Sequence, residues 1–212
     1  MPAIDENLTL ACLTEFLADD YAKLRLYMGE SLFNALGRHC LAADAVKAPK
    51  ARALSRHLPD FLDLVKPFSR SPELSDLARL EMAFHAALNA PDAPILTRTT
   101  FPWGHGKFRI ELHPSFQRLQ LRTNATSIWA ALTAGELPPP PKRLDEPLEL
   151  LVWRQGTMPR FRMLGREEAI TLDEAARGAA IEIDQASENF LRGWLEAEVI
   201  SSARLMDATR PL

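Results

Sequence analysis

The clearest helical signal in this chain is the stretch SPELSDLARLEMAFHAALNAP, residues 71–91. Ser71 is a favoured N-cap residue, and Pro72 suits the first helical position, where its missing N–H costs nothing. The apolar residues that follow are spaced three, four and four positions apart, as one face of a helix requires: Leu77, Leu80, Phe84 and Leu88. Pro91 ends the pattern, so the stretch predicts a long amphipathic helix.

Helical spacing also extends toward the N-terminus. Two groups of apolar residues show it: Leu8, Cys12, Leu13, Phe16 and Leu17, then Leu32, Phe33, Leu36, Cys40 and Leu41. A shorter element is expected over residues 58–65. Helices this amphipathic and this closely connected should pack as a small bundle. Cys12 and Cys40 both lie on apolar stretches, so we expect buried, reduced thiols.

Beyond residue 91 the pattern changes to strands, turns and short helices. Residues 107–113 alternate between polar and apolar side chains, as a half-buried strand does. Residues 148–155 and 158–164 read as an antiparallel hairpin turned at Gly156. Prolines 138–141 predict a stiff polyproline spacer.

Three short helices are expected in the same region. Asn124 can cap one that carries Ile128, Trp129 and Leu132. Thr171 and Glu174 have capping-box spacing and predict a helix that Gly178 closes. Ser187 should begin the last one. We therefore predict an α+β protein with a helical domain over residues 1–92 and a smaller domain with an antiparallel sheet over 93–212.

Composition and charge narrow the class of protein. The 212 residues are 47% hydrophobic and 25% charged, as in an ordinary globular protein. No run of about 18 apolar residues and no signal peptide is found, which predicts a cytoplasmic protein that does not span a membrane. The net charge of −3 is uneven, because residues 98–166 carry 11 Lys and Arg against 5 Asp and Glu. This basic segment fits either an anionic partner or complementary surfaces within the chain.

No catalytic or cofactor motif is found. The chain has no glycine-rich phosphate loop, no Cys-x-x-Cys, no His-x-x-x-His and no Gly-x-Ser-x-Gly elbow. Its five histidines are scattered, so we expect no metal, no cofactor and no catalytic residue in this chain. Arginines gather around the predicted strands, which indicates either a solvated sheet face or recognition of carboxylates and phosphates. Trp129 and Trp153 are more typical of core residues than of binding platforms.

Five segments, in order, resemble the HvfC/BufC family, whose N-terminal domain is catalogued as a DNA-binding domain. In chain order they are LPDFL at 58–62, DLARLEMAFH at 76–85, LHPS at 112–115, SIW at 127–129 and LLVWR at 150–154. The resemblance spans roughly residues 30–200, and the methanobactin-biosynthesis protein MbnC is a distant relative of the family. It implies a non-catalytic subunit that forms a heterodimer with a TIM-barrel, multinuclear-iron enzyme of the MbnB type. The subunit would bind the leader of a ribosomally made precursor peptide as an added strand and present its cysteines for modification.

Within that resemblance we assign two groups of residues. Trp153, Arg154, Arg160 and Arg162 are expected to bind the peptide. Arg79, His85, His113 and Arg122 are expected at the interface with the enzyme. The alternative that the sequence leaves open is a DNA-binding transcriptional regulator, for which residues 171–194 form the stretch most like a helix-turn-helix.

Overall fold

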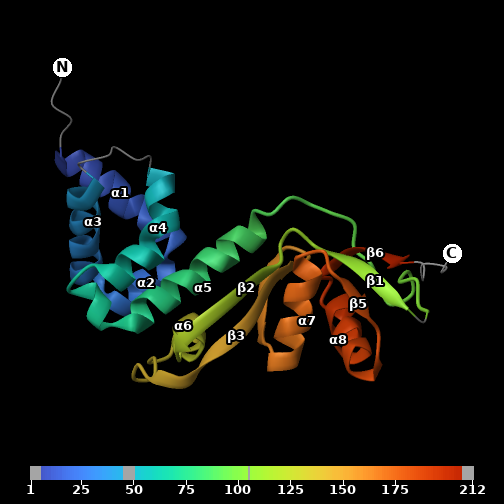
Figure 1. Ribbon diagram of the computed structural model, residues 1–212. Coiled ribbons are helices and arrows are strands. Elements are labelled where there is room, and N and C mark those ends of the chain that lie inside the picture. The colour runs from blue at the N-terminus through green and yellow to red at the C-terminus, as the bar shows by residue number, and fades with distance from the viewer. Residues whose placement is uncertain (1–5, 45–50, 105, 207–212) are drawn as a thin grey trace. The chain divides into compact units, whose positions relative to one another are not determined.

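The computed structural model describes residues 6–44, 51–104 and 106–206. Within them the chain forms eight α-helices, a 3₁₀ turn and six strands in two small antiparallel sheets (Figure 1). The expected α+β class is therefore confirmed. The chain divides into two compact units. Unit 1 comprises the described residues of 1–85 and 121–148, and unit 2 those of 86–120 and 149–212. This interleaved division differs from the expected boundary at residue 92.

Unit 1 is built mainly of helices. They are α1 (Glu6–Asp20), α2 (Ala22–Met28), α3 (Glu30–Asp44), α4 (Ala51–Leu64), the first part of α5 (Pro72–Leu88) and α6 (Ala125–Ala134). The helix predicted from Ser71-Pro72 is thus present as α5. Leu17, Leu36 and Leu80 have no exposed surface and lie in the core. The element expected at 58–65 begins earlier, at Ala51, and contains Pro59 inside the helix.

The proline-rich segment after α6 is held by a side chain at the start of that helix. Asn124 is the N-cap residue of α6, but its side chain makes no capping hydrogen bond. Its amide nitrogen instead donates to the carbonyl of Pro140 over 3.0 Å. Its amide oxygen accepts the N–H of Lys142 over 2.7 Å. Asn124, just before α6, therefore holds the end of this connection that leads into the next strand.

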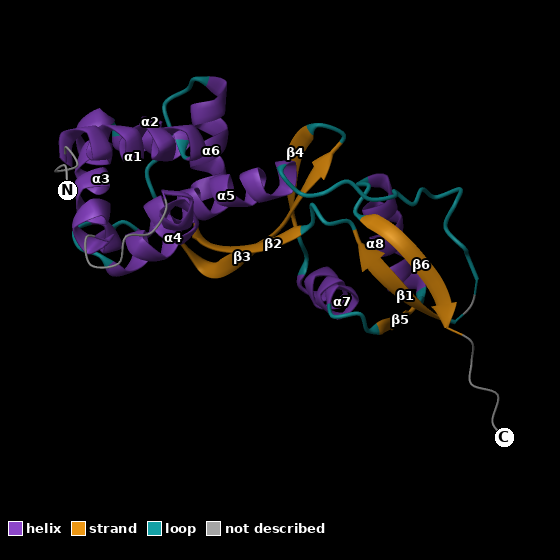
Figure 2. Cartoon of the chain, turned by 90° about the horizontal axis from the view of Figure 1, so that it is seen from above, coloured by secondary structure: helices purple, strands orange, loops and turns teal. Residues whose placement is uncertain are grey.

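The strands form two sheets. They are β1 (Lys107–Leu112), β2 (Gln117–Thr123), β3 (Arg143–Gln155), β4 (Met158–Met163), β5 (Ala180–Glu182) and β6 (Ile200–Met206). One sheet has the order β5-β1-β6 and the other β2-β3-β4 (Figure 2). The predicted strand and hairpin are present as β1 and as β3–β4, with Gln155 opposite Met158. Strands β2, β5 and β6 were not predicted.

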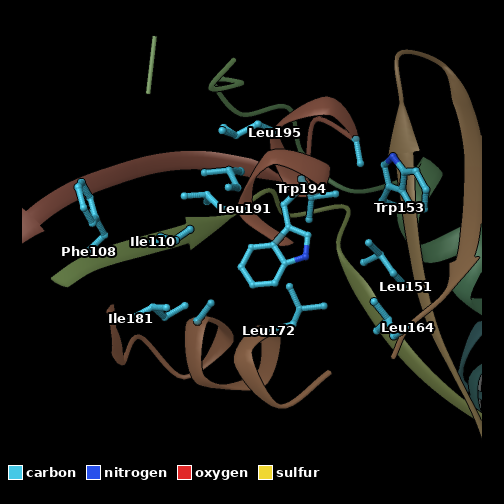
Figure 3. Packing of buried hydrophobic residues seen from close by; sticks show 14 of the residues in the cluster. Phe108, Ile110, Leu151, Trp153, Leu164, Leu172, Ile181, Leu191, Trp194 and Leu195 are labelled. Atoms are coloured by element: carbon cyan, nitrogen blue, oxygen red, sulfur yellow. The ribbon is translucent and has the colours of Figure 1, made fainter. Parts of the chain in front are cut away.

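The core of unit 2 is formed by side chains of two helices that pack against side chains of the strands. These helices are α7 (Arg166–Ala176) and α8 (Gln185–Glu196). Leu172 of α7 and Trp194 of α8 face Ile110 of β1 in the buried cluster (Figure 3). Alternation along β1 accounts for this, since Phe108 and Ile110 are buried whereas their neighbours are exposed. The two helices therefore cover one face of the β5-β1-β6 sheet.

The predicted starts of α7 and α8 were wrong. α7 begins at Arg166, after Gly165, and Thr171 lies inside it, where its hydroxyl donates to the carbonyl of Glu167 over 3.0 Å. Such a bond to the preceding turn is a common alternative to capping for threonine. α8 begins after Asp184, which forms a capping box with Ser187 at the third helical position. Spacing alone does not distinguish an N-cap from a residue within the first turns.

The two cysteines differ in burial, and the helices bear on the question of a membrane span. Cys40 is buried, as expected, but Cys12 is exposed, and neither forms a disulfide. The expectation of a buried thiol was therefore wrong for Cys12. None of the helices among the described residues is both long and apolar enough to cross a membrane.

Candidate functional site

The β3–β4 hairpin places the predicted peptide-binding residues on two opposite faces. Trp153 pairs with Arg160, and Leu151 pairs with Arg162, so these four side chains share one face. Arg154 pairs with Pro159 and points to the other face, because successive residues of a strand alternate. The three arginines therefore do not lie on a single face of the hairpin.

Arg154 is committed to contacts within unit 2. Its guanidinium donates to the carbonyl of Leu88, the last residue of α5, over 3.2 Å and to the carboxylate of Asp92 over 2.5 Å. Its backbone N–H donates to the hydroxyl of Ser115 over 3.2 Å. Only 15% of the Arg154 side chain is exposed. Arg154 therefore satisfies a carbonyl at the C-terminal end of α5, a favourable place for a cation.

Arg162 is also bound internally. It donates two hydrogen bonds to the carboxylate of Glu168, one of them over 2.8 Å. The same carboxylate accepts the indole N–H of Trp194 over 2.8 Å. Glu168 is buried, so these donors compensate for its removal from water. Arg162 therefore joins β4 to α7 and α8.

Arg160 is different, because its side chain is exposed and makes no hydrogen bond or ion pair with the described part of the chain. It lies on β4, the last strand of its sheet. Met158 and Met163, near the two ends of β4, are exposed. Of the predicted peptide-binding residues, Arg160 is the one whose charge is available to a ligand.

Trp153 lies in the core of unit 2 rather than on a surface (Figure 3). Its indole N–H is buried and has no hydrogen-bond partner within residues 6–44, 51–104 and 106–206. A buried donor without a partner typically costs about 1–3 kcal/mol. The structure thus places Trp153 where an aromatic platform for a ligand would not be accessible.

Arg79 and Arg122 meet at two aspartates inside unit 1. Asp76 has no exposed surface and accepts the backbone N–H groups of Arg122 and Thr123 over 2.7 and 2.8 Å. Asp63 accepts hydrogen bonds from both arginines. Burial tends to raise the pKa of Asp63. The hydrogen bonds from Arg79, Ser75 and Arg122 outweigh this effect and lower the pKa to about 2. This network binds the C-terminal end of β2 to α4 and α5.

The two predicted histidines have different surroundings. His85 is partly exposed on α5, and its Nδ1 lies 3.9 Å from the carboxylate of Asp20. His113 follows β1 and is only 4% exposed. Its Nδ1 accepts the backbone N–H of Ser115 over 3.2 Å and lies 2.9 Å from the Ser115 hydroxyl. Burial, together with the charge of Arg154, lowers the pKa of His113 below its ordinary value and so favours the neutral ring.

Sequence reasoning missed two buried carboxylates that organise unit 1. Asp76 was read only as part of a family-like motif, and Glu81 was not singled out. Both stand among apolar residues of α5, and a carboxylate at such a position signals a partner elsewhere in the fold. The partners themselves, in α2 and at the end of β2, could not be identified without the tertiary structure.

Comparison with known proteins adds no relative, because no protein-family model matches the chain and no curated protein is significantly similar to it. Among the described residues, no group of three or more His, Cys, Asp and Glu side chains is placed to hold a metal ion. In the part of the chain that the structure describes, the edge strand β4 carries the exposed Arg160, and the buried His113 lies beside β1.

Proposed function

We propose that this protein is a non-catalytic partner subunit that captures an acidic segment of a precursor peptide along β4 and presents the peptide to a separate metalloenzyme. The resemblance of its motifs to the HvfC/BufC family supports the proposal and names the enzyme class, a TIM-barrel iron enzyme. The main structural support is that β4 is an edge strand and that it bears Arg160, whose side chain makes no hydrogen bond or ion pair with the described residues. The location of this subunit, by the same argument, is the cytoplasm.

The backbone of β4 fits strand addition. The N–H of Leu164 donates to the carbonyl of Glu149 over 2.8 Å, so even-numbered residues of β4 point their backbone groups toward β3. The odd-numbered residues point the other way, and the first of them is Pro159. Proline is tolerated at such a position because no neighbouring strand requires its missing N–H. An extended peptide can extend this side of the sheet through backbone hydrogen bonds.

The charges on the hairpin support an acidic ligand and divide the arginines by role. Arg160 is exposed on β4 and can pair with a carboxylate of the added strand. Arg154 and Arg162 do not contact the ligand themselves. Their ion pairs with Asp92 and Glu168 hold the hairpin in place. Exposed methionines at the two ends of β4 supply adaptable apolar contacts.

Two observations weigh against the alternative, a DNA-binding regulator. Of the eleven basic residues in 98–166, five form ion pairs with carboxylates of unit 1 or unit 2: Arg98, Arg118, Arg122, Arg154 and Arg162. Much of the basic segment is therefore neutralised internally. In addition, strand β5 lies between α7 and α8, so residues 171–194 do not form a helix-turn-helix.

The test is a titration of an extended synthetic peptide rich in aspartate and glutamate into the wild type, Arg160→Ala and Arg109→Ala. Arg109 is exposed on β1 and serves as the matched control. We expect Arg160→Ala to weaken binding about five- to tenfold at low salt, as loss of a partly exposed charge-assisted bond does. Arg109→Ala should bind like the wild type. Equal affinity of all three proteins, or protection from hydrogen exchange confined to unit 1, would refute the β4 site.

A further inference from the structure

A pocket of about 350 Å³ lies beside β1 in unit 2, at the C-terminal end of α7. Its apolar walls are Ile110, Leu112, Phe116 and Ala175, and His113 also lines it. β5 pairs only with Lys107–Arg109, so the pocket occupies the place beside β1 that β5 no longer covers. Its volume is at the lower end of the range for small-ligand sites.

The hydrogen bonds of His113 fix which ring nitrogen carries the proton. Nδ1 accepts the Ser115 N–H, and it cannot carry a proton while doing so. The Ser115 hydroxyl accepts the N–H of Arg154, which leaves its own hydrogen for Nδ1. The neutral ring is therefore protonated at Nε2. Nε2 makes no hydrogen bond with any described residue, and it is not one of the fully buried polar atoms that lack a partner, so it retains some contact with solvent.

We propose that this pocket binds one apolar residue of a peptide, with the Nε2–H of His113 donating to a backbone carbonyl of that residue. The apolar walls take the side chain, and the edge of β1 supplies backbone groups that match an amide. Glu111 also contributes to the lining, but its side chain alternates onto the opposite face of β1 from Ile110, where its carboxylate accepts the Ser202 hydroxyl over 2.6 Å. The apolar walls disfavour a charged residue at this position. The pocket is thus distinct in chemistry from the acidic-peptide site proposed at β4, and neither requires the other.

The experiment uses three capped tripeptides, acetyl-Gly-Leu-Gly-amide, acetyl-Gly-Gly-Gly-amide and acetyl-Gly-Asp-Gly-amide. Each is titrated into the full chain carrying ¹⁵N-labelled histidine, and the ring nitrogens of His113 are followed by NMR. His113→Phe assigns the signals. Before ligand is added, the His113 spectrum should show the neutral Nε2–H form at pH 7. The leucine peptide should shift it saturably, and more tightly than the glycine peptide, with the aspartate peptide weakest.

Two variants complete the test. Ala176 is exposed and lines the pocket, so Ala176→Trp should fill it and abolish the shift while leaving the protein folded. Arg177→Trp, at the next exposed position and outside the pocket lining, is the control and should bind like the wild type. His113→Phe should weaken the leucine peptide about tenfold by fluorescence or calorimetry, as loss of one hydrogen bond does. An Nδ1–H form of His113, equal binding of the three peptides, or an unaltered shift in Ala176→Trp would overturn the proposal.

Discussion

The hydroxyl of Tyr21 donates a hydrogen bond to the backbone carbonyl of Ser55, with 2.5 Å between the two oxygens. Pro59 stands four residues after Ser55 within α4, and proline has no N–H to offer that carbonyl. A buried side chain of another segment therefore supplies the donor that the helix itself lacks. This explains how α4 accommodates a proline in its interior.

Removing that hydroxyl should destabilise the protein through the unpaired carbonyl. We expect Tyr21→Phe to lower the free energy of unfolding by about 1–3 kcal/mol in urea denaturation. In a Pro59→Ala background, the restored N–H can bond to Ser55, so the same substitution should cost clearly less. Tyr27→Phe, at a partly buried tyrosine of α2, is the control. An equal cost in the two backgrounds would disprove the link between Tyr21 and Pro59.

Asp76 should be the most sensitive carboxylate of unit 1. Asp76→Ala leaves the N–H groups of Arg122 and Thr123 without their acceptor and removes a buried partner of two arginines. Breaking a buried charged network of this kind typically costs about 3–5 kcal/mol. Asp60, whose side chain is 71% exposed and 3.6 Å from Arg79, provides the control. Asp60→Ala should change the free energy of unfolding by less than about 1 kcal/mol.

Glu81 should make stability depend on pH near neutrality. Burial raises the pKa of Glu81 from its ordinary 4.5 to about 7, against the opposing effect of the N–H groups of Lys23 and Leu24, which donate to the carboxylate over 2.7 and 2.9 Å. The folded protein therefore holds a proton between pH 4.5 and 7 that the unfolded chain has released. This contribution to stability is fully present below pH 4.5 and is lost as the pH rises through 7.

The difference between wild type and Glu81→Gln isolates that contribution from other carboxylates. Unfolding free energies measured from pH 5 to pH 8 should fall more steeply for the wild type, by a few kcal/mol at most. Parallel pH profiles for the two proteins would show that Glu81 does not titrate in this range. The two proteins should agree best at the acid end, where the glutamate is neutral in the folded state.

Replacing the two arginines of β4 should affect the free energy of unfolding to different extents. Arg162→Ala removes donors from the buried Glu168 and should lower the free energy of unfolding by about 1–3 kcal/mol. Arg160→Ala removes an exposed side chain without a partner among the described residues and should change it by less than about 0.5 kcal/mol. Glu168→Gln in the Arg162→Ala background should recover part of the loss, because no buried charge then remains. A larger effect at Arg160 than at Arg162 would contradict the assigned contacts.

Local patterns in the sequence were sufficient for the elements whose residues interact mainly with near neighbours. The helix after Ser71-Pro72 and the hairpin around Gly156 follow from capping, periodicity and turn preference, which act over a few residues. β5 and β6 were missed because β5 has three residues and β6 is recognisable chiefly by its pairing with β1. Short strands carry too little periodicity to be distinguished from loops.

The sequence by itself determined the α+β class, α5, the β3–β4 hairpin and the presence of many arginines near the strands. Only the tertiary structure decided which of those arginines are available, since Arg154 finds Asp92 and Arg162 finds Glu168, whereas Arg160 has no such partner among the described residues. It also decided that Nδ1 of His113 lies against the N–H and the hydroxyl of Ser115. The physical reason is that a charged group or a ring nitrogen forms its hydrogen bonds with groups within about 3 Å. Folding, not sequence spacing, brings those groups together.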